Sequence, residues 1–123
     1  MITKEQYETF CELRNNIQKR AEEIFHLLKD VSLSWREYYE GCTVDGDLEF
    51  RVGGHYLGEY DYSLFNRPIE YLFMTDEEIN KAEEDREKEL KKAEELAEKE
   101  RQQKMQEKEI EQLKELRKKY PFA

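Results

Sequence analysis

The sequence predicts an α+β protein in which an N-terminal helix packs on a three-stranded antiparallel sheet and a long charged C-terminal helix follows. Apolar residues recur every three or four positions at the start of the chain, and apolar and polar residues alternate through its middle. Neither proline nor glycine occurs between residues 75 and 119. We therefore divide the chain into a small α+β domain at 1–74 and a charged helix at 75–120.

The first helix is expected to run from about Thr3 to Lys29. Thr3 and Gln6 form a capping box at its start, because each can satisfy a free amide of the first turn. Its apolar positions form one continuous face, which we expect to be the core side: Tyr7, Phe10, Leu13, Ile17, Ala21, Ile24, Leu27 and Leu28.

Three strands are expected between Asp30 and Phe73. Each is indicated by alternation with polar residues: Val31, Leu33 and Trp35 in the first, Leu48, Phe50 and Val52 in the second, and Tyr60, Tyr62 and Leu64 in the third. Asp45-Gly46 predicts a tight turn, Gly53-Gly54 is expected to break the second strand, and Pro68 to end the third. Residues 69–73 are expected to form a short apolar connection.

The long helix is expected from Thr75 to Lys119. Thr75 and Glu78 form a second capping box, and Pro121 prevents continuation. Apolar residues are sparse between Ala82 and Ile110, while glutamates recur four residues before lysines, each pair contributing roughly 0.2–0.5 kcal/mol. Such a helix can exist without a core.

Three interpretations of this helix remain open. It could be a solvated arm, or a coiled coil whose seam is Ile110, Leu113, Leu116 and Tyr120, through which the chain could form a homodimer. A nucleic-acid-binding arm is disfavoured, because residues 76–119 contain 16 acids and 13 bases.

The overall charge is −9 with a pI near 4.9. This balance disfavours direct binding to nucleic acid or membranes and favours a basic protein as partner. No signal peptide or membrane-spanning run is evident, so we expect a cytoplasmic protein. Cys11 and Cys42 have no CxxC spacing and are expected to be reduced thiols.

The middle segment carries the candidate binding residues. Residues 30–73 hold nine acids against three bases, interleaved with aromatic rings. In one interpretation the rings form the core and the acids keep the sheet soluble; in another, the acidic face imitates a phosphate backbone. We predict that carboxylates steer the partner and rings anchor it. The steering residues are Asp45, Asp47, Glu49, Glu59 and Asp61, and the anchors are Trp35, Tyr56 and Tyr60.

Catalysis finds little support in the sequence. Asp45 with Asp47, or Glu59 with Asp61, could in principle hold a hard metal or transfer protons, but pairs of this kind arise by chance in so acidic a chain. No glycine-rich phosphate loop or nucleophile elbow occurs. We expect neither an enzyme nor a cofactor or metal site.

Several short segments resemble small accessory proteins of bacteriophages and prophages of Gram-positive bacteria. They are the T-K-E-Q start, Arg20–Ile24, the G-G-H-Y segment, the tyrosine-rich strand, P-I-E-Y-L-F at Pro68–Phe73, and the Glu/Lys-rich tail. The resemblance implies a phage-encoded protein that inhibits a basic host defence protein, for example an anti-CRISPR that binds a Cas nuclease. The alternative is a self-associating coiled-coil scaffold or adaptor.

Overall fold

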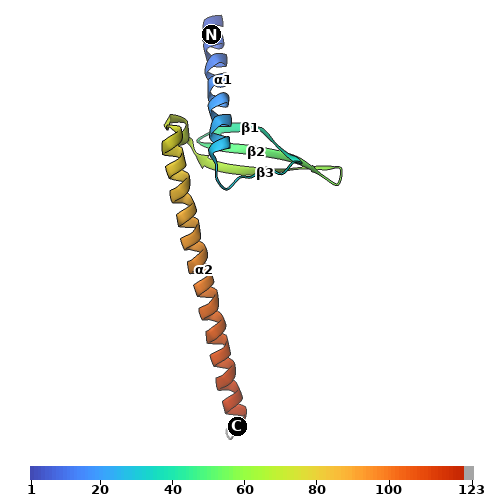
Figure 1. The fold of residues 1–123 in the computed structure, drawn as a ribbon, viewed down its shortest axis with the longest axis vertical. Coiled ribbons are helices and arrows are strands. Elements are labelled where there is room, and N and C mark those ends of the chain that lie inside the picture. The colour runs from blue at the N-terminus through green and yellow to red at the C-terminus, as the bar shows by residue number, and fades with distance from the viewer. Residues whose placement is uncertain (121–123) are drawn as a thin grey trace. The chain divides into compact units, whose positions relative to one another are not determined.

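The computed structural model describes residues 1–120 and confirms the α+β architecture (Figure 1). The elements in order are α1 (Lys4–Leu27), β1 (Glu37–Asp45), β2 (Asp47–Tyr56), β3 (Glu59–Pro68), the 3-10 helix η1 (Ile69–Phe73) and α2 (Asp76–Lys119). The chain divides into one compact unit at residues 1–84 and a second that begins at Asp85.

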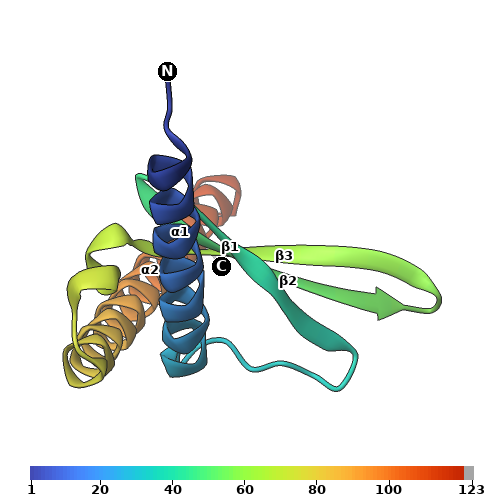
Figure 2. The same cartoon turned by 90° about the horizontal axis from the view of Figure 1, so that it is seen from above.

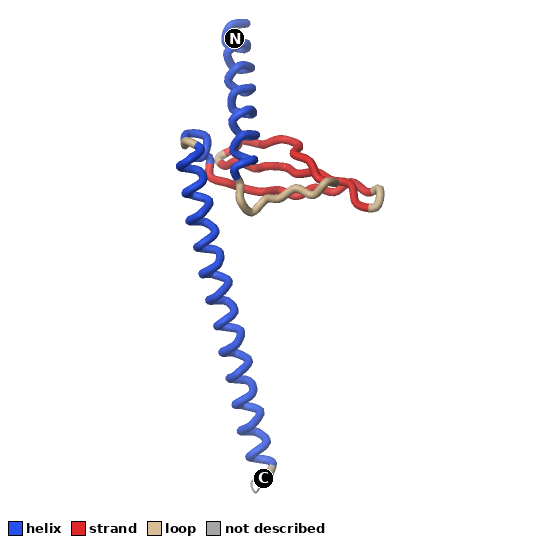
Figure 3. The backbone as a smooth tube through the Cα atoms, in the orientation of Figure 1, coloured by secondary structure: helices blue, strands red, loops and turns tan. Residues whose placement is uncertain are grey.

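The three strands form one antiparallel sheet in the order β1-β2-β3, as expected for a meander (Figure 3). Asp45 pairs with Asp47 across the predicted turn at Gly46, whose φ of +73° suits glycine. The predicted break at Gly53-Gly54 is wrong. Both glycines lie inside β2, because β1 and β3 pair with them from the two sides.

The strand predicted at residues 31–35 is also wrong. This segment is loop, and β1 begins at Glu37. Val31 packs against the core from the loop, whereas Trp35 is 86% exposed, so the alternation reflects a loop that touches the core at one point. The Glu37 amide donates to the Ser34 carbonyl at 3.0 Å, and this turn leads the chain into β1.

The core lies between the C-terminal half of α1 and one face of the sheet. Ala21, Ile24 and Phe25 of α1 are buried against Leu48, Phe50 and Val52 of β2. Burying side chains of this size contributes about 1.5–3 kcal/mol each.

The N-terminal half of α1 has no such cover, and the expectation of one continuous core face is wrong. Tyr7, Phe10 and Leu13 are 62%, 58% and 56% exposed, and Ile17 is 37% exposed. The first turns of α1 extend past the edge of the sheet (Figure 1). The capping box at Thr3 and Gln6 is confirmed, with bonds of 3.0 and 3.1 Å.

The first turns of α2 belong to the N-terminal unit. Thr75 caps the helix by accepting the Glu78 amide at 3.2 Å, while the Glu78 carboxylate accepts from the Thr75 hydroxyl rather than from the cap amide. Ile79 and Glu83 are buried, so the unit continues past the boundary at residue 74 that the sequence suggests.

A buried ion pair joins this start of α2 to β3. Arg67 Nε donates to the two carboxylate oxygens of Glu83 at 3.1 and 3.2 Å, and both side chains are 2% exposed. The Tyr71 hydroxyl donates to Glu83 at 2.9 Å, and Asp30 accepts from Arg67. The network therefore ties the loop after α1, β3, η1 and α2 together.

The remainder of α2 is helical through Lys119, as predicted, and every residue from 88 to 120 is exposed. Leu90, Leu96 and Met105 are isolated on its surface at 47%, 62% and 65% exposure. Strong helix formers, with a local ion pair at 3.4 Å between Arg101 and Glu98, thus support this part of the helix in place of a core.

The β2–β3 turn contains an unusual backbone residue. Leu57 has a φ of +54° and Gly58 a φ of +84°, which is the two-residue turn that favours Asn-Gly. The Leu57 side chain is 99% exposed. We expect Leu57→Asn to raise the free energy of unfolding by about 1 kcal/mol in urea titration, because asparagine tolerates the left-handed conformation better. A lower stability would contradict this account of the turn.

Candidate protein-binding surface

The face of the sheet opposite α1 carries a connected group of polar and aromatic side chains, which we call the tyrosine face. The strand register places its members together: Tyr38 pairs with Gly53 on β2, which pairs with Tyr62, and His55 pairs with Tyr60. Glu40 and Arg51 complete the group. The tyrosine face consists of Tyr38, Glu40, Arg51, His55, Tyr60 and Tyr62.

A β-bulge brings Glu40 into this group. The β1–β2 register shifts between Tyr39 and Gly41, so Glu40 is an extra residue opposite Arg51. Arg51 Nε donates to Glu40 at 2.7 Å. The carboxylate lies across Gly53, where a Cβ would overlap its Oε1. A side chain at residue 53 would therefore displace Glu40.

The Tyr60 hydroxyl locks the Glu40 carboxylate in this position. It donates to the two carboxylate oxygens at 2.6 and 2.7 Å, and Arg51 donates to the same hydroxyl at 3.2 Å. The Tyr60 hydroxyl, followed by Arg51, lowers the pKa of Glu40 below its ordinary value. Glu40 and Arg51 are therefore both charged at neutral pH, and the network is complete there.

The rings around this network form a row on the sheet. His55 lies 6.5 Å from Tyr38 and 5.6 Å from Tyr60, and Tyr60 lies 6.4 Å from Tyr62 between ring centroids. The Arg51 guanidinium sits 3.9 Å above the Tyr62 ring. The three tyrosines are 44–48% exposed. The rings are thus held in place while much of their surface remains accessible.

A shallow hollow of about 520 Å³ adjoins the tyrosine face near the β2–β3 turn. Its lining includes Trp35, Tyr38, His55 and Leu57. Trp35 projects from the loop, with the Arg36 guanidinium 4.6 Å above its ring. The β2–β3 hairpin reaches away from α1 (Figure 2). The predicted anchor Trp35 therefore extends the tyrosine face along an accessible part of the hairpin.

The five predicted steering acids lie at two ends of the sheet. Asp45, Asp47 and Glu49 are at the β1–β2 turn, whereas Glu59 and Asp61 are at the β2–β3 turn. Along β2 the two groups are about 17 Å apart at their nearest members, Glu49 and Asp61, and about 30 Å apart at their farthest. The structure does not bring the five acids into one patch. Among the described residues, none of them forms an ion pair, so their charge remains available to a partner.

The predicted anchors are also placed differently from one another. Tyr60 belongs to the tyrosine face, but Tyr56 pairs with Glu59 and so alternates onto the opposite side of the hairpin. There the pKa of Tyr56 is raised by burial and by the nearby Glu37 carboxylate. Tyr56 thus flanks the acidic side of the hairpin, with Glu59 and Asp61.

Sequence reasoning missed five members of the tyrosine face: Tyr38, Glu40, Arg51, His55 and Tyr62. Tyr62 could have been found, because it shares the alternation of Tyr60. Glu40 could be found only from the Glu-Gly pair at residues 40–41, which is typical of a bulge.

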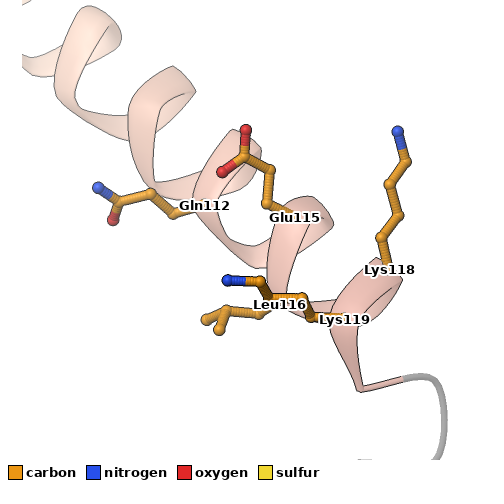
Figure 4. A pocket seen from close by; sticks show the side chains of 5 residues that line it. All are labelled: Gln112, Glu115, Leu116, Lys118 and Lys119. Atoms are coloured by element: carbon orange, nitrogen blue, oxygen red, sulfur yellow. The ribbon is translucent and has the colours of Figure 1, made fainter.

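The predicted self-association residues on α2 are exposed. Ile110, Leu113, Leu116 and Tyr120 show exposed fractions of 52%, 59%, 53% and 61%. Leu116 projects on the same side of the helix as Gln112 and Lys119 (Figure 4). An apolar stripe is therefore available on this segment.

Within residues 1–120 the structure offers few groups suited to other chemistry. No cluster of three or more His, Cys, Asp or Glu side chains could hold a metal ion among these residues. Burial raises the pKa of the Cys42 thiol to about 11, which disfavours the nucleophilic thiolate. In the described part of the chain, no helix is both long and apolar enough to span a bilayer.

A scan against protein-family models and searches of curated proteins and of solved structures gave no match to this chain.

Proposed function

We propose that the chain is a binding protein that engages a basic protein partner through the tyrosine face and the adjoining Trp35 hollow. The observation that carries this proposal is a row of half-exposed tyrosines fixed by the Glu40–Arg51–Tyr60 network. Rigid rings bury large areas at a low cost in conformational entropy, and tyrosine and tryptophan are enriched at binding hot spots.

Electrostatics supports the basic character of this partner. The chain carries a net charge of −9, and the acids on the hairpin, Glu59 and Asp61, form no ion pair within the described residues. Arg51 stacked on Tyr62 and paired with Glu40 shows how this surface accommodates a guanidinium. An arginine-rich surface of a partner could stack on the neighbouring rings in the same way.

The resemblance to small phage proteins specifies the partner class. In this proposal the chain is a phage-encoded stoichiometric inhibitor of a host defence protein, such as a Cas nuclease whose nucleic-acid channel is basic. A tagged pull-down from a Gram-positive host at low and high salt tests this directly. A single basic nuclease or nucleic-acid-binding protein, released by salt, is the expected result; recovery of no such protein at low salt would overturn this partner class.

Variants of the tyrosine face then test its role in binding the partner that the pull-down recovers. Tyr38→Ala combined with Tyr60→Ala is expected to weaken binding by about 30-fold, which corresponds to roughly 2 kcal/mol at a hot spot. Phe73→Ala is the matched control, since Phe73 is 82% exposed on η1, away from the tyrosine face. Equal affinity of the double variant and the control would contradict the role of the tyrosine face.

Charge reversal separates the two acidic ends. Glu59→Lys with Asp61→Lys should weaken binding and reduce its salt dependence, because these acids lie on the same hairpin as the rings. Asp45→Lys with Asp47→Lys makes the same change in charge about 30 Å away along the strand and should have a smaller effect. A larger loss of affinity from the Asp45 and Asp47 variant would move the contact to the β1–β2 turn. If neither double variant changed the affinity, electrostatic steering would be excluded.

A further inference from the structure

The exposed half of α1 presents an apolar face with few charges around it, which we call the α1 stripe: Tyr7, Phe10, Leu13 and Ile17. These residues are 37–62% exposed. On a helical projection the flanking positions Thr9, Cys11, Asn16 and Gln18 are uncharged, and Arg14 lies within the stripe with its guanidinium 5.9 Å from the Phe10 ring centroid. In a chain with 30 acids, an apolar face with no carboxylate at its border has the composition of an interface.

A groove runs beside the α1 stripe. It encloses a volume of about 580 Å³ and is lined from α1 by Phe10, Leu13, Arg14, Ile17 and Gln18, and from β1 by Cys42, Thr43 and Val44. Apolar side chains make up much of this lining, so the groove can receive apolar side chains of another helix.

The end of α2 carries a second apolar face, which we call the α2 stripe: Ile110, Leu113, Leu116 and Tyr120. Both stripes step through the sequence by three, three and four residues. Each also contains one arginine at the equivalent place, Arg14 in the first and Arg117 in the second. The two faces thus match in length and in the spacing of their side chains.

The net charges of the two segments favour pairing an α1 stripe with an α2 stripe. Residues 3–17 contain two bases and three acids, a net charge of −1, whereas residues 106–120 contain five bases and four acids, a net charge of +1. A pair of α1 stripes or a pair of α2 stripes would bring together like net charges. An α1 stripe against an α2 stripe is neutral overall, so this combination is electrostatically preferred.

Charge also selects the direction. A parallel pairing in register would place Arg14 level with Arg117. An antiparallel pairing instead places Arg14 within a turn of Glu109, and puts Glu5 and Glu8 at the end that carries Lys118 and Lys119. The antiparallel arrangement also aligns the helix dipoles favourably.

We propose that the α2 stripe of one copy of the chain docks antiparallel on the α1 stripe and groove of a second copy. The occupant is a second copy of the chain because the two stripes match in the spacing of their side chains and are complementary in net charge. In a dimer each copy supplies one stripe of each kind, so the contact forms twice. This inference does not depend on the tyrosine face.

Two double variants test the pairing. Phe10→Gln with Leu13→Gln removes the α1 stripe, and Leu113→Gln with Leu116→Gln removes the α2 stripe; glutamine keeps helix propensity and net charge. The four replaced side chains are 53–59% exposed, so both double variants should fold like the unmodified chain. By sedimentation equilibrium, the unmodified chain should associate as its concentration rises, and each double variant alone should remain monomeric.

A mixture of the two variants provides the decisive result. One variant retains the α1 stripe and the other retains the α2 stripe, so the mixture should form a heterodimer with one contact. A control with Leu90→Gln and Leu96→Gln, at exposed positions of the same helix, should associate like the unmodified chain.

Other outcomes would overturn the proposal. Association that survives loss of the α1 stripe would indicate a pair of α2 stripes, and association that survives loss of the α2 stripe would indicate a pair of α1 stripes. A monomeric unmodified chain at all concentrations, or a mixture that stays monomeric, would exclude the contact.

Discussion

Replacing Arg67 with methionine is expected to lower the free energy of unfolding by about 3–5 kcal/mol. The substitution leaves the Glu83 carboxylate buried without its cation, and Glu83 is only 2% exposed. Asp30 loses the same partner. An uncompensated buried charge is costly because desolvation of the carboxylate is no longer offset by an ion pair. Urea titration followed by far-ultraviolet circular dichroism measures the change.

Arg51→Met is the matched control, because it removes an arginine that also forms a 2.7 Å ion pair but lies at the surface. Its expected effect on stability is below about 1 kcal/mol. The double variant Arg67→Met with Glu83→Leu should recover most of the lost stability, since an apolar pair can replace a buried ion pair. Equal losses for Arg67→Met and Arg51→Met would contradict the importance of burial.

This network explains why the sequence could not show that the first turns of α2 pack with the N-terminal unit. The N-cap at Thr75 located the first turn well, because capping is a local interaction. That Glu83 is buried depends on Arg67, which is sixteen residues away in sequence. The spacing of apolar residues carries no information about an ion pair such as Arg67–Glu83. The sequence therefore placed the whole of α2, including its first turns, outside the N-terminal domain.

The strands show the same contrast between local and long-range information. Alternation located β2 through its core-facing residues Leu48, Phe50 and Val52. It located β3 through Tyr60, Tyr62 and Leu64, which share the opposite face of the sheet. In β1 the bulge at Glu40 shifts the register, so Tyr39 and Cys42 face the core without regular spacing. The alternation at residues 31–35 is therefore more regular than the alternation within β1 itself.

The candidate surface was only partly accessible to sequence reasoning for a related reason. Composition predicted that rings and acids of the middle segment form a binding surface, and Tyr60 lies at its centre in our proposal. The face on which each ring lies depends on the strand register and on the bulge at Glu40. Both are set by pairing between strands, which the sequence does not show directly. Likewise, the period of α1 indicated an apolar face but could not show that the sheet covers only its C-terminal half.

Replacing Phe50 with alanine is expected to lower the free energy of unfolding by about 3–5 kcal/mol. Phe50 is fully buried at the centre of β2, opposite Cys42 on β1 and Phe65 on β3, and its ring lies 5.8 Å from that of Phe25. Alanine would leave a cavity where α1 meets the sheet, which the surrounding strands cannot fill without breaking their register. Thermal and urea unfolding measure the loss.

Phe73→Ala removes the same side chain from a position that is 82% exposed, and its effect should stay within about 0.5 kcal/mol. The comparison matters for function because Phe50 is followed by Arg51, whose ion pair with Glu40 orders the tyrosine face on the opposite side of the sheet. A sheet loosened by Phe50→Ala should therefore bind the partner weakly at temperatures where Phe73→Ala binds normally. Full binding by a Phe50→Ala protein that is measurably destabilised would show that the tyrosine face does not depend on the packing beneath it.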